Sequence, residues 1–233
     1  MTPIIDYIIL ARMSSGRLSG KMLMPLEGEP LLWYPVYSLL EYTERKRVTV
    51  ATSEESSDDP IAEYCESLGV RCFRGSLHNV AERFRDCILE LDCDYAVRVC
   101  GDNIFVSHQI LDEFTNVMET DAYDFVSNTP NRTFPSGMSF EAVRKEVYLK
   151  YFPSFRKEKG DLEHVMPYFY RLENLNTYYL ENTIYPKLSG FQLSVNTNED
   201  KEQIEEMLKG IETNHYSVSL KTLYDLYEKT RKN

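Results

Sequence analysis

The sequence predicts an α/β protein in which helices cover both faces of a mostly parallel β-sheet. Short apolar runs, typical of strands buried on both faces, alternate with longer segments whose apolar residues recur at helical spacing. This alternation favours a three-layer α/β/α arrangement with right-handed crossovers. A chain of 233 residues can bury a large core, and we find no repeat or linker, so we expect a single domain over residues 1–233.

The first half of the chain carries four predicted strand–helix pairs. Strands are expected at residues 4–10, 48–53, 70–73 and 95–99. Helices are expected from Pro30 to residue 40, from Asp58 to a stop at Gly69, from 80 to 91, and after Ser107 as N-cap. Polar residues follow the strand ends, where the ligands of parallel sheets bind. We therefore expect Arg12, Ser53, Arg74 and Asp102 to converge on one crevice.

The second half has a less regular pattern. After residues 124–128 a short strand is expected within 137–143 and an edge strand at 176–181, and residues 191–195 alternate between apolar and polar. Helices are expected at 145–152, from 161, from 198 to 208 behind Thr197, and from 220 to 229 behind Ser219.

Composition excludes several classes of protein. The net charge of −11 argues against nucleic acid as the main partner, and no apolar run approaches the length of a membrane span, so we expect a cytoplasmic protein. Five cysteines without a C-x-x-C pair indicate buried thiols rather than a zinc site or disulfides. Seventeen tyrosines are compatible with a subunit interface, which leaves a homodimer open.

The segment 10–21 follows the first strand and reverses the sign of the local charge. Arg12, Arg17 and Lys21 against Asp6 give residues 1–24 a net charge of +2. Glycines allow backbone N–H groups to point toward a ligand, and guanidinium groups bind phosphate well, so an anion-binding loop is predicted. The alternative is a solvated basic loop.

This loop matches neither common phosphate motif. Only three residues separate Gly16 from Gly20, and Met22 follows Lys21 where a Walker A loop needs Ser or Thr. The G-x-G-x-x-G of dinucleotide-binding folds is also absent. A P-loop kinase and a dinucleotide dehydrogenase are therefore both disfavoured.

The loop does resemble the A-R-x-x-S-x-R-L-P-G-K signature of the SpsF-type spore-coat polysaccharide cytidylyltransferases, which are related to the synthetases of CMP-activated sugar acids. Ser19 stands where that family has proline. Further segments match the family in the same order: Ala51-Thr52-Ser53 with Asp58-Asp59-Pro60, Phe73-Arg74-Gly75-Ser76 with Arg83-Phe84, Gly101-Asp102, Gly137 with Glu141, Glu163-His164-Val165, and Ser194 to Asp200. The resemblance thus covers nearly the whole chain.

The resemblance implies a Rossmann-like nucleotidyltransferase fold and a set of site residues. The residues it implies for nucleotide binding are Leu10, Ala11, Arg12, Ser14, Gly16, Arg17, Lys21, Thr52, Ser53, Arg74, Ser76, Arg83 and Gly101. The ligands it implies for a Mg²⁺ cofactor are Asp102 and Asn196, the second of which is aspartate in the family. The residues it implies for acceptor binding are Gly137, Glu141, Glu163 and His164.

Several of these residues also have a structural interpretation. Arg83 could be an exposed helix cation, Asp102 a turn residue that bonds its own backbone, and His164 a structural hydrogen bonder. Asn196 could simply be a polar residue before a helix cap.

The implied function is transfer of CMP from CTP to a sugar acid, or to a small phosphorylated or phosphonate acceptor, with release of pyrophosphate in surface polysaccharide or related biosynthesis. The alternative is a catalytically impaired nucleotide-binding partner protein of a sugar-nucleotide pathway. It is suggested by Ser19, Ile104 and Asn196, each of which replaces a residue typical of the family.

Overall fold

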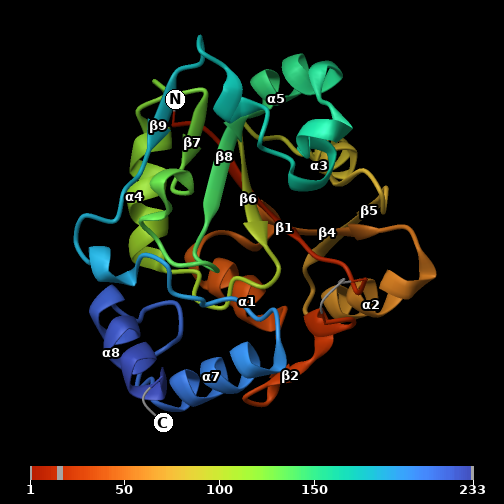
Figure 1. Cartoon of the computed structure of the whole chain (residues 1–233). Helices are drawn as coiled ribbons and strands as arrows, with labels where there is room; N and C mark the ends of the chain where they lie inside the picture. The colour runs from red at the N-terminus through yellow and green to blue at the C-terminus, as the bar shows by residue number, and fades with distance from the viewer. Residues whose placement is uncertain (1, 15–17, 232–233) are drawn as a thin grey trace.

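The computed structural model describes residues 2–14 and 18–231. At its centre lies a seven-stranded sheet of order β5-β4-β1-β6-β8-β7-β9 (Figure 1). The strands are β1 (Ile5–Leu10), β4 (Val48–Ser53), β5 (Arg71–Gly75), β6 (Tyr95–Cys100), β7 (Phe125–Ser127), β8 (Phe140–Arg144) and β9 (Thr177–Tyr179). A separate two-residue hairpin pairs β2 (Pro25–Leu26) with β3 (Glu29–Pro30).

The helices that flank the sheet begin and end close to the predicted positions. They are α1 (Trp33–Tyr42), α2 (Asp59–Ser67), α3 (Val80–Glu90), α4 (His108–Glu119), α5 (Lys145–Tyr151), α6 (Asp161–His164), α7 (Asn198–Lys209) and α8 (Leu220–Arg231). Single turns of 3-10 helix, among them η1 (Lys21–Leu23), connect them. The predicted α/β class and the mostly parallel sheet are confirmed.

The register of the sheet brings the ends of three strands together. β1 pairs in parallel with both β4 and β6, so that Leu10 lies opposite Ala51 on one side and Cys100 on the other. Within this sheet only β8 runs antiparallel to its neighbours β6 and β7. The loops that follow β1, β4 and β6 therefore leave the sheet at the same edge.

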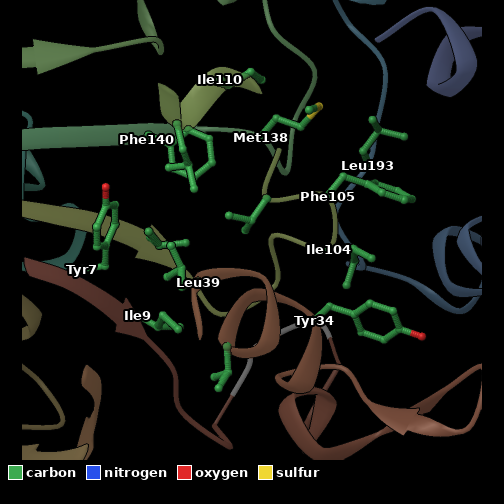
Figure 2. Packing of buried hydrophobic residues seen from close by; sticks show 14 of the residues in the cluster. Tyr7, Ile9, Tyr34, Leu39, Ile104, Phe105, Ile110, Met138, Phe140 and Leu193 are labelled. Carbon is green, nitrogen blue, oxygen red and sulfur yellow. The ribbon is translucent and has the colours of Figure 1, made fainter. Parts of the chain in front are cut away.

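Two hydrophobic clusters fill the two spaces between sheet and helices. The larger one joins alternate residues of β1 and β6 to α1, α2, α4, α7 and α8. Figure 2 shows part of it, with Tyr34 and Leu39 from α1 and Ile104 and Phe105 from the segment after β6. The other cluster packs α3 and α5 on the opposite face of the sheet. These clusters produce the three layers that the sequence predicted.

Hydrogen bonds explain where several helices begin. Thr197 accepts from Asp200 N while the Asp200 side chain accepts from Thr197 N, which completes a capping box for α7. Ser219 Oγ accepts from Thr222 N at 3.1 Å before α8. Ser107 occupies the N-cap position of α4, but its side chain makes no capping hydrogen bond. Both α7 and α8 thus start where the sequence places their caps.

Two stretches depart from regular structure. The segment 191–195 takes part in isolated β-bridges, one joining Asn103 to Ser194 and the other Ser136 to Gln192. The helix that starts at Asp161 has only four residues, because Val165 takes a positive φ of 71°.

The five cysteines are unpaired thiols, as the sequence predicts. None of the helices in the described residues is long and apolar enough to cross a membrane.

Candidate active site

A cavity of about 330 Å³ opens beyond the carboxyl ends of β1 and β6, bounded on one side by α3 and α6. Four cationic and two acidic side chains line it among the described residues, an excess of two positive charges in a chain that carries −11. A concave surface of one sign concentrates ligands of the opposite sign. Its lining residues are Leu10, Ala11, Arg12, Ser14, Lys21, Met22, Val80, Arg83, Arg98, Cys100, Gly101, Asp102, Glu163 and His164.

The loop after β1 is held in place by hydrogen bonds to β4, to Asp58 and within the loop itself. Ala11 N bonds to Ala51 O at 3.2 Å, and Gly20 N bonds to Met13 O at 2.8 Å. Asp58, fully buried, accepts from Met13 N at 2.7 Å and from Ser53 Oγ at 2.5 Å. Burial alone would raise the pKa of Asp58, but the hydrogen bonds that it accepts lower its pKa below the ordinary value. Asp58 therefore anchors this loop as a carboxylate.

Lys21 joins the two segments to which the sequence assigned a metal. Its Nζ lies 2.5 Å from Asp102 Oδ2 and 2.9 Å from Val195 O, the residue before Asn196. Lys21 is the first residue of η1, and its side chain is buried, with 9% of its surface exposed. A positive charge thus lies between Asp102 and the start of α7.

Gly101 allows the ends of β1 and β6 to approach closely. Its N bonds to Leu10 O at 2.9 Å, and a Cβ here would lie 2.8 Å from Met22 Sδ and 3.0 Å from Leu10 O. A side chain at this position would displace the floor of the cavity. The role of Gly101 at the site is therefore steric.

The helix α6 brings an acidic and an imidazole side chain to the opposite wall. Glu163 Oε1 accepts from Arg12 NH2 at 2.5 Å, and the ring of His164 packs over Gly160. The helix ends in a γ-turn centred on buried Val165, with φ 71°, ψ −50° and a 2.8 Å bond from Met166 N to His164 O. This turn is rare and strained, and such strain is concentrated at functional sites.

Two buried guanidinium groups face the same cavity. Arg83 on α3 donates to Ser76 O at 2.9 Å, and burial together with neighbouring Arg12 lowers its pKa to about 10. Arg98 on β6 donates to Glu141 Oε2 at 2.6 Å. The Nε of each is enclosed by the protein and has no hydrogen-bond partner within the described part of the chain. The Arg98 side chain is 17% exposed, so its terminal nitrogens can contact a ligand in the cavity.

The structure brings ten of the predicted site residues to the cavity and leaves others away from it. The ten are Leu10, Ala11, Arg12, Ser14, Lys21, Arg83, Gly101, Asp102, Glu163 and His164. Gly16 and Arg17 lie outside the described residues.

Arg74 and Ser76 line a neighbouring cavity of about 420 Å³. Arg74 bonds to Ser53 O and Glu55 O at 2.9 Å, and to Asp59 at 2.6 Å. The predicted convergence is thus correct for Arg12 and Asp102, which line the same cavity, whereas Arg74 lines a different one.

Thr52, Ser53, Gly137 and Glu141 do not line the cavity. Thr52 and Ser53 are fully buried in β4, and Ser53 holds Asp58. Gly137, at φ 94°, crosses so close to Leu193 that a Cβ would lie 2.5 Å from Leu193 O. Glu141 is 5% exposed and reaches the cavity only through Arg98.

Sequence reasoning missed Arg98 at this site. A cation in the middle of the apolar run from Tyr95 to Val99 is the signal that could have found it. Its partner, Glu141, lies 43 positions away on β8. Only the register of β6 against β8 places the two side chains opposite each other.

Of the two predicted magnesium ligands, Asp102 lines the cavity and Asn196 does not, although Lys21 contacts both Asp102 and the carbonyl of Val195, the residue before Asn196. No cluster of three or more His, Cys, Asp or Glu side chains that could hold a metal alone occurs in residues 2–14 and 18–231. Mg²⁺ commonly uses one or two carboxylates and completes its shell with phosphates and water. Asp102 is 20% exposed at the cavity, and Asn196 donates from Nδ2 to Ser194 Oγ at 3.4 Å, a bond that does not use its amide oxygen. One carboxylate and one amide oxygen are of the chemical kind that Mg²⁺ accepts beside phosphates and water.

The sequence of this chain is similar to those of known proteins. The family model described as cytidylyltransferase matches residues 7–229. The spore coat polysaccharide biosynthesis protein SpsF of Bacillus subtilis is 30% identical over 212 residues, which cover 86% of this chain and 84% of that protein.

Two solved structures show the same fold. A cytidylyltransferase from Leptospira borgpetersenii superposes with a TM-score of 0.87 at 27% identity, covering 99% of this chain and 95% of that chain. A CMP:2-keto-3-deoxy-manno-octonic acid synthetase complexed with CTP superposes with a TM-score of 0.66 at 15% identity, covering 89% and 99%.

Proposed function

The chain belongs to the cytidylyltransferase family, and on that premise we propose that it transfers CMP from CTP to a small anionic acceptor with release of pyrophosphate. The observation that carries the proposal is the cationic cavity beyond β1 and β6, with an excess of two positive charges in an acidic chain. A triphosphate needs such a cavity, and Arg12, Ser14 and Lys21 of its lining come from the loop that resembles the family's signature.

In the proposed reaction an acceptor oxygen attacks the α-phosphorus of CTP, the bond from that phosphorus to the bridging oxygen breaks, and pyrophosphate leaves. The reaction needs positioning and charge neutralisation more than covalent help from the protein. Arg12 and Lys21 are the groups that would neutralise phosphate oxygens. Their present partners, Glu163 and Asp102, hold these cations at the cavity wall, where phosphates could replace the acidic oxygens.

A bound Mg²⁺ would be held by Asp102 and the amide oxygen of Asn196, and would supply polarisation of the phosphate oxygens. Lys21 would then exchange part of its contact with Asp102 for the triphosphate. The proposed acceptor is a sugar acid or a small phosphorylated or phosphonate compound, in the synthesis of a surface polysaccharide. This part of the proposal is supported by the similarity to SpsF, a spore coat polysaccharide biosynthesis protein, and to the CMP:2-keto-3-deoxy-manno-octonic acid synthetase.

None of the three departures from the family pattern lines the cavity. Ile104 is fully buried in the larger hydrophobic cluster, and Ser19 is exposed in the turn before η1. Of the three, only Asn196 stands where the family pattern has a charged residue. This distribution favours an active enzyme over the impaired nucleotide-binding partner protein.

Calorimetric titration with the four ribonucleoside triphosphates in Mg²⁺ tests the nucleotide preference. We expect the protein to bind CTP more tightly than ATP, GTP or UTP. Equal or tighter binding of a purine triphosphate would contradict the proposal. Tight CTP binding without turnover on any acceptor would favour the partner protein.

A further inference from the structure

We infer that Arg98 binds the anionic group of the acceptor, and that this group is a carboxylate. The inference rests on the proposed function, because it assigns one subsite of the same cavity. It gives Arg98 direct contact with the acceptor and makes Glu141 a positioning residue behind it.

The geometry of Arg98 leaves donors for a ligand. The side chain lines the cavity between β6 and α6, beside Cys100 and Gly101. NH1 donates to Glu141 Oε2 at 2.6 Å and NH2 to Cys100 Sγ at 3.2 Å, while Nε is enclosed by the protein and has no partner within the described residues. A guanidinium group carries five N–H donors, and sulfur is a weak acceptor. NH1 and NH2 each have a second N–H beyond these contacts, and with 17% of the side chain exposed at the cavity these donors are available to an oxyanion.

A buried hydrogen-bond chain fixes the orientation of this guanidinium group. Glu141 receives Arg98 on one carboxylate oxygen and Tyr170 OH, at 2.5 Å, on the other. Tyr170 OH in turn lies 2.6 Å from Ser127 Oγ, which accepts from Thr129 N at 3.0 Å. Both oxygens of Glu141 thus accept a hydrogen bond from the protein. Because Glu141 is 5% exposed and does not line the cavity, it positions Arg98 without contacting the acceptor.

Arg98 is separate from the cations expected to bind triphosphate. Arg12 and Lys21 come from the loop after β1, whereas Arg98 stands inside β6, four residues before Asp102 on the chain. An acceptor anchored at Arg98 would lie between the sheet and His164 of α6, facing the phosphates across the same cavity. One cavity would then hold two anionic groups at different walls.

Charge favours a carboxylate over a phosphate at this position. Glu141 already balances the charge of Arg98 at close range. A dianionic phosphate would place two further charges near that carboxylate, whereas a monoanion adds one, and like charges at short range are costly. A planar carboxylate also matches the guanidinium fork.

The competing explanation is a structural ion pair that only ties β6 to β8. It predicts that changing Arg98 affects folding but not the choice of ligand. The matched control is Arg144 on β8, which pairs with Asp121 at 2.6 Å and does not line the cavity.

The test uses Arg98→Lys, Arg98→Met with Glu141→Gln, and Arg144→Met. The double change removes both charges together, so that no unpaired carboxylate remains buried. Thermal melting checks folding, and calorimetry with CTP checks the nucleotide site. Each folded variant, loaded with CTP in the presence of Ca²⁺ to slow turnover, is then titrated with 3-deoxy-manno-octulosonate, with its C1 amide and with inorganic phosphate by saturation-transfer NMR.

We expect the parent protein to prefer the acid over the amide, and both Arg98 variants to lose affinity for the acid by about tenfold or more while their CTP affinity stays within about twofold. The variants should also lose the preference of acid over amide, which Arg144→Met retains. Equal acid binding by the parent and the Arg98 variants, absence of acid binding by the parent, or tighter binding of phosphate would each overturn the inference. Absence of CTP binding by the parent would instead contradict the proposed function itself.

Discussion

Three of the four cations that line the cavity among the described residues form an ion pair with an acidic side chain, and the pairs differ in burial. Arg12 and Glu163 have 34% and 45% of their side-chain surface exposed, so their ion pair contributes little to stability and is easily exchanged for a ligand. Lys21 is buried and holds both Asp102 and a backbone carbonyl. A ligand phosphate at Lys21 would therefore find its donor already in place.

Changing Lys21 to Met should weaken CTP binding. Charge-assisted hydrogen bonds contribute about 1.5–3 kcal/mol, which corresponds to a loss of affinity of about 10- to 150-fold. Lys46→Met is the control, since Lys46 is 64% exposed and pairs only with neighbouring Glu44. Calorimetry measures both. A Lys21→Met protein that folds and binds CTP like the parent would reduce the loop to a basic surface.

Changing Asn196 to Asp should lower the Mg²⁺ concentration needed for turnover, because it adds a negative ligand beside Asp102. Asn198→Asp is the matched control, which adds the same charge at the first residue of α7. Rates are measured against Mg²⁺ for the three proteins. Superimposable curves for the parent and Asn196→Asp would remove Asn196 from the metal site.

Changing Asp58 to Asn should destabilise the fold by about 1–3 kcal/mol at neutral pH, because Ser53 and Met13 lose a buried charged acceptor. The folded state lowers the pKa of Asp58 below its ordinary 3.8. Its stabilisation is therefore complete above that value and is lost as the pH falls through the folded pKa. Urea unfolding of both proteins at several pH values measures this. A difference that stayed constant into strong acid would be inconsistent with an ionised Asp58.

At the scale of elements, the segment before α8 is attached to α1 through a buried histidine. His215 is 7% exposed, its Nε2 lies 3.0 Å from Tyr34 O, and its ring packs edge-on against Tyr34 at 4.9 Å. Burial lowers the pKa of His215 from 6.5 to about 4. A neutral imidazole thus holds the C-terminal helices to the first helix.

This attachment should make the protein sensitive to acid. The unfolded chain binds a proton at His215 below pH 6.5, while the folded chain resists until about pH 4, so stability falls as the pH drops between these values. The shift corresponds to at most about 3 kcal/mol. In His215→Gln this part of the acid sensitivity should disappear. The control is exposed His78→Gln, and a parent-like pH profile for His215→Gln would refute the assignment.

At the scale of the whole molecule, the sequence predicted the helix ends correctly where a stop or cap residue marks them. The helix α2 stops at Gly69, whose φ of 63° needs glycine, and α7 begins at the Thr197 capping box. The four-residue length of α6 could not be predicted, because the strained turn at Val165 depends on tertiary packing.

The site was predictable to the extent that it lies at strand ends. Arg12 and Asp102 follow β1 and β6, and the parallel register brings them to one edge. Arg98 and Glu141 were not assigned to each other, because no sequence pattern reveals which residues face one another across antiparallel β6 and β8. The burial of Arg83 was likewise invisible in a sequence where it resembles a surface cation.

The most direct test of the central claim follows the phosphorus of CTP through the reaction. The protein, Mg²⁺, CTP labelled at the α-phosphorus and an acceptor such as 3-deoxy-manno-octulosonate are incubated, and labelled product and pyrophosphate are both quantified. We predict that label moves to the acceptor as CMP in equal amounts with released pyrophosphate, and that Lys21→Met reduces both together. Release of CDP and inorganic phosphate, or CTP binding without transfer to any sugar acid, phosphate or phosphonate acceptor, would contradict the account.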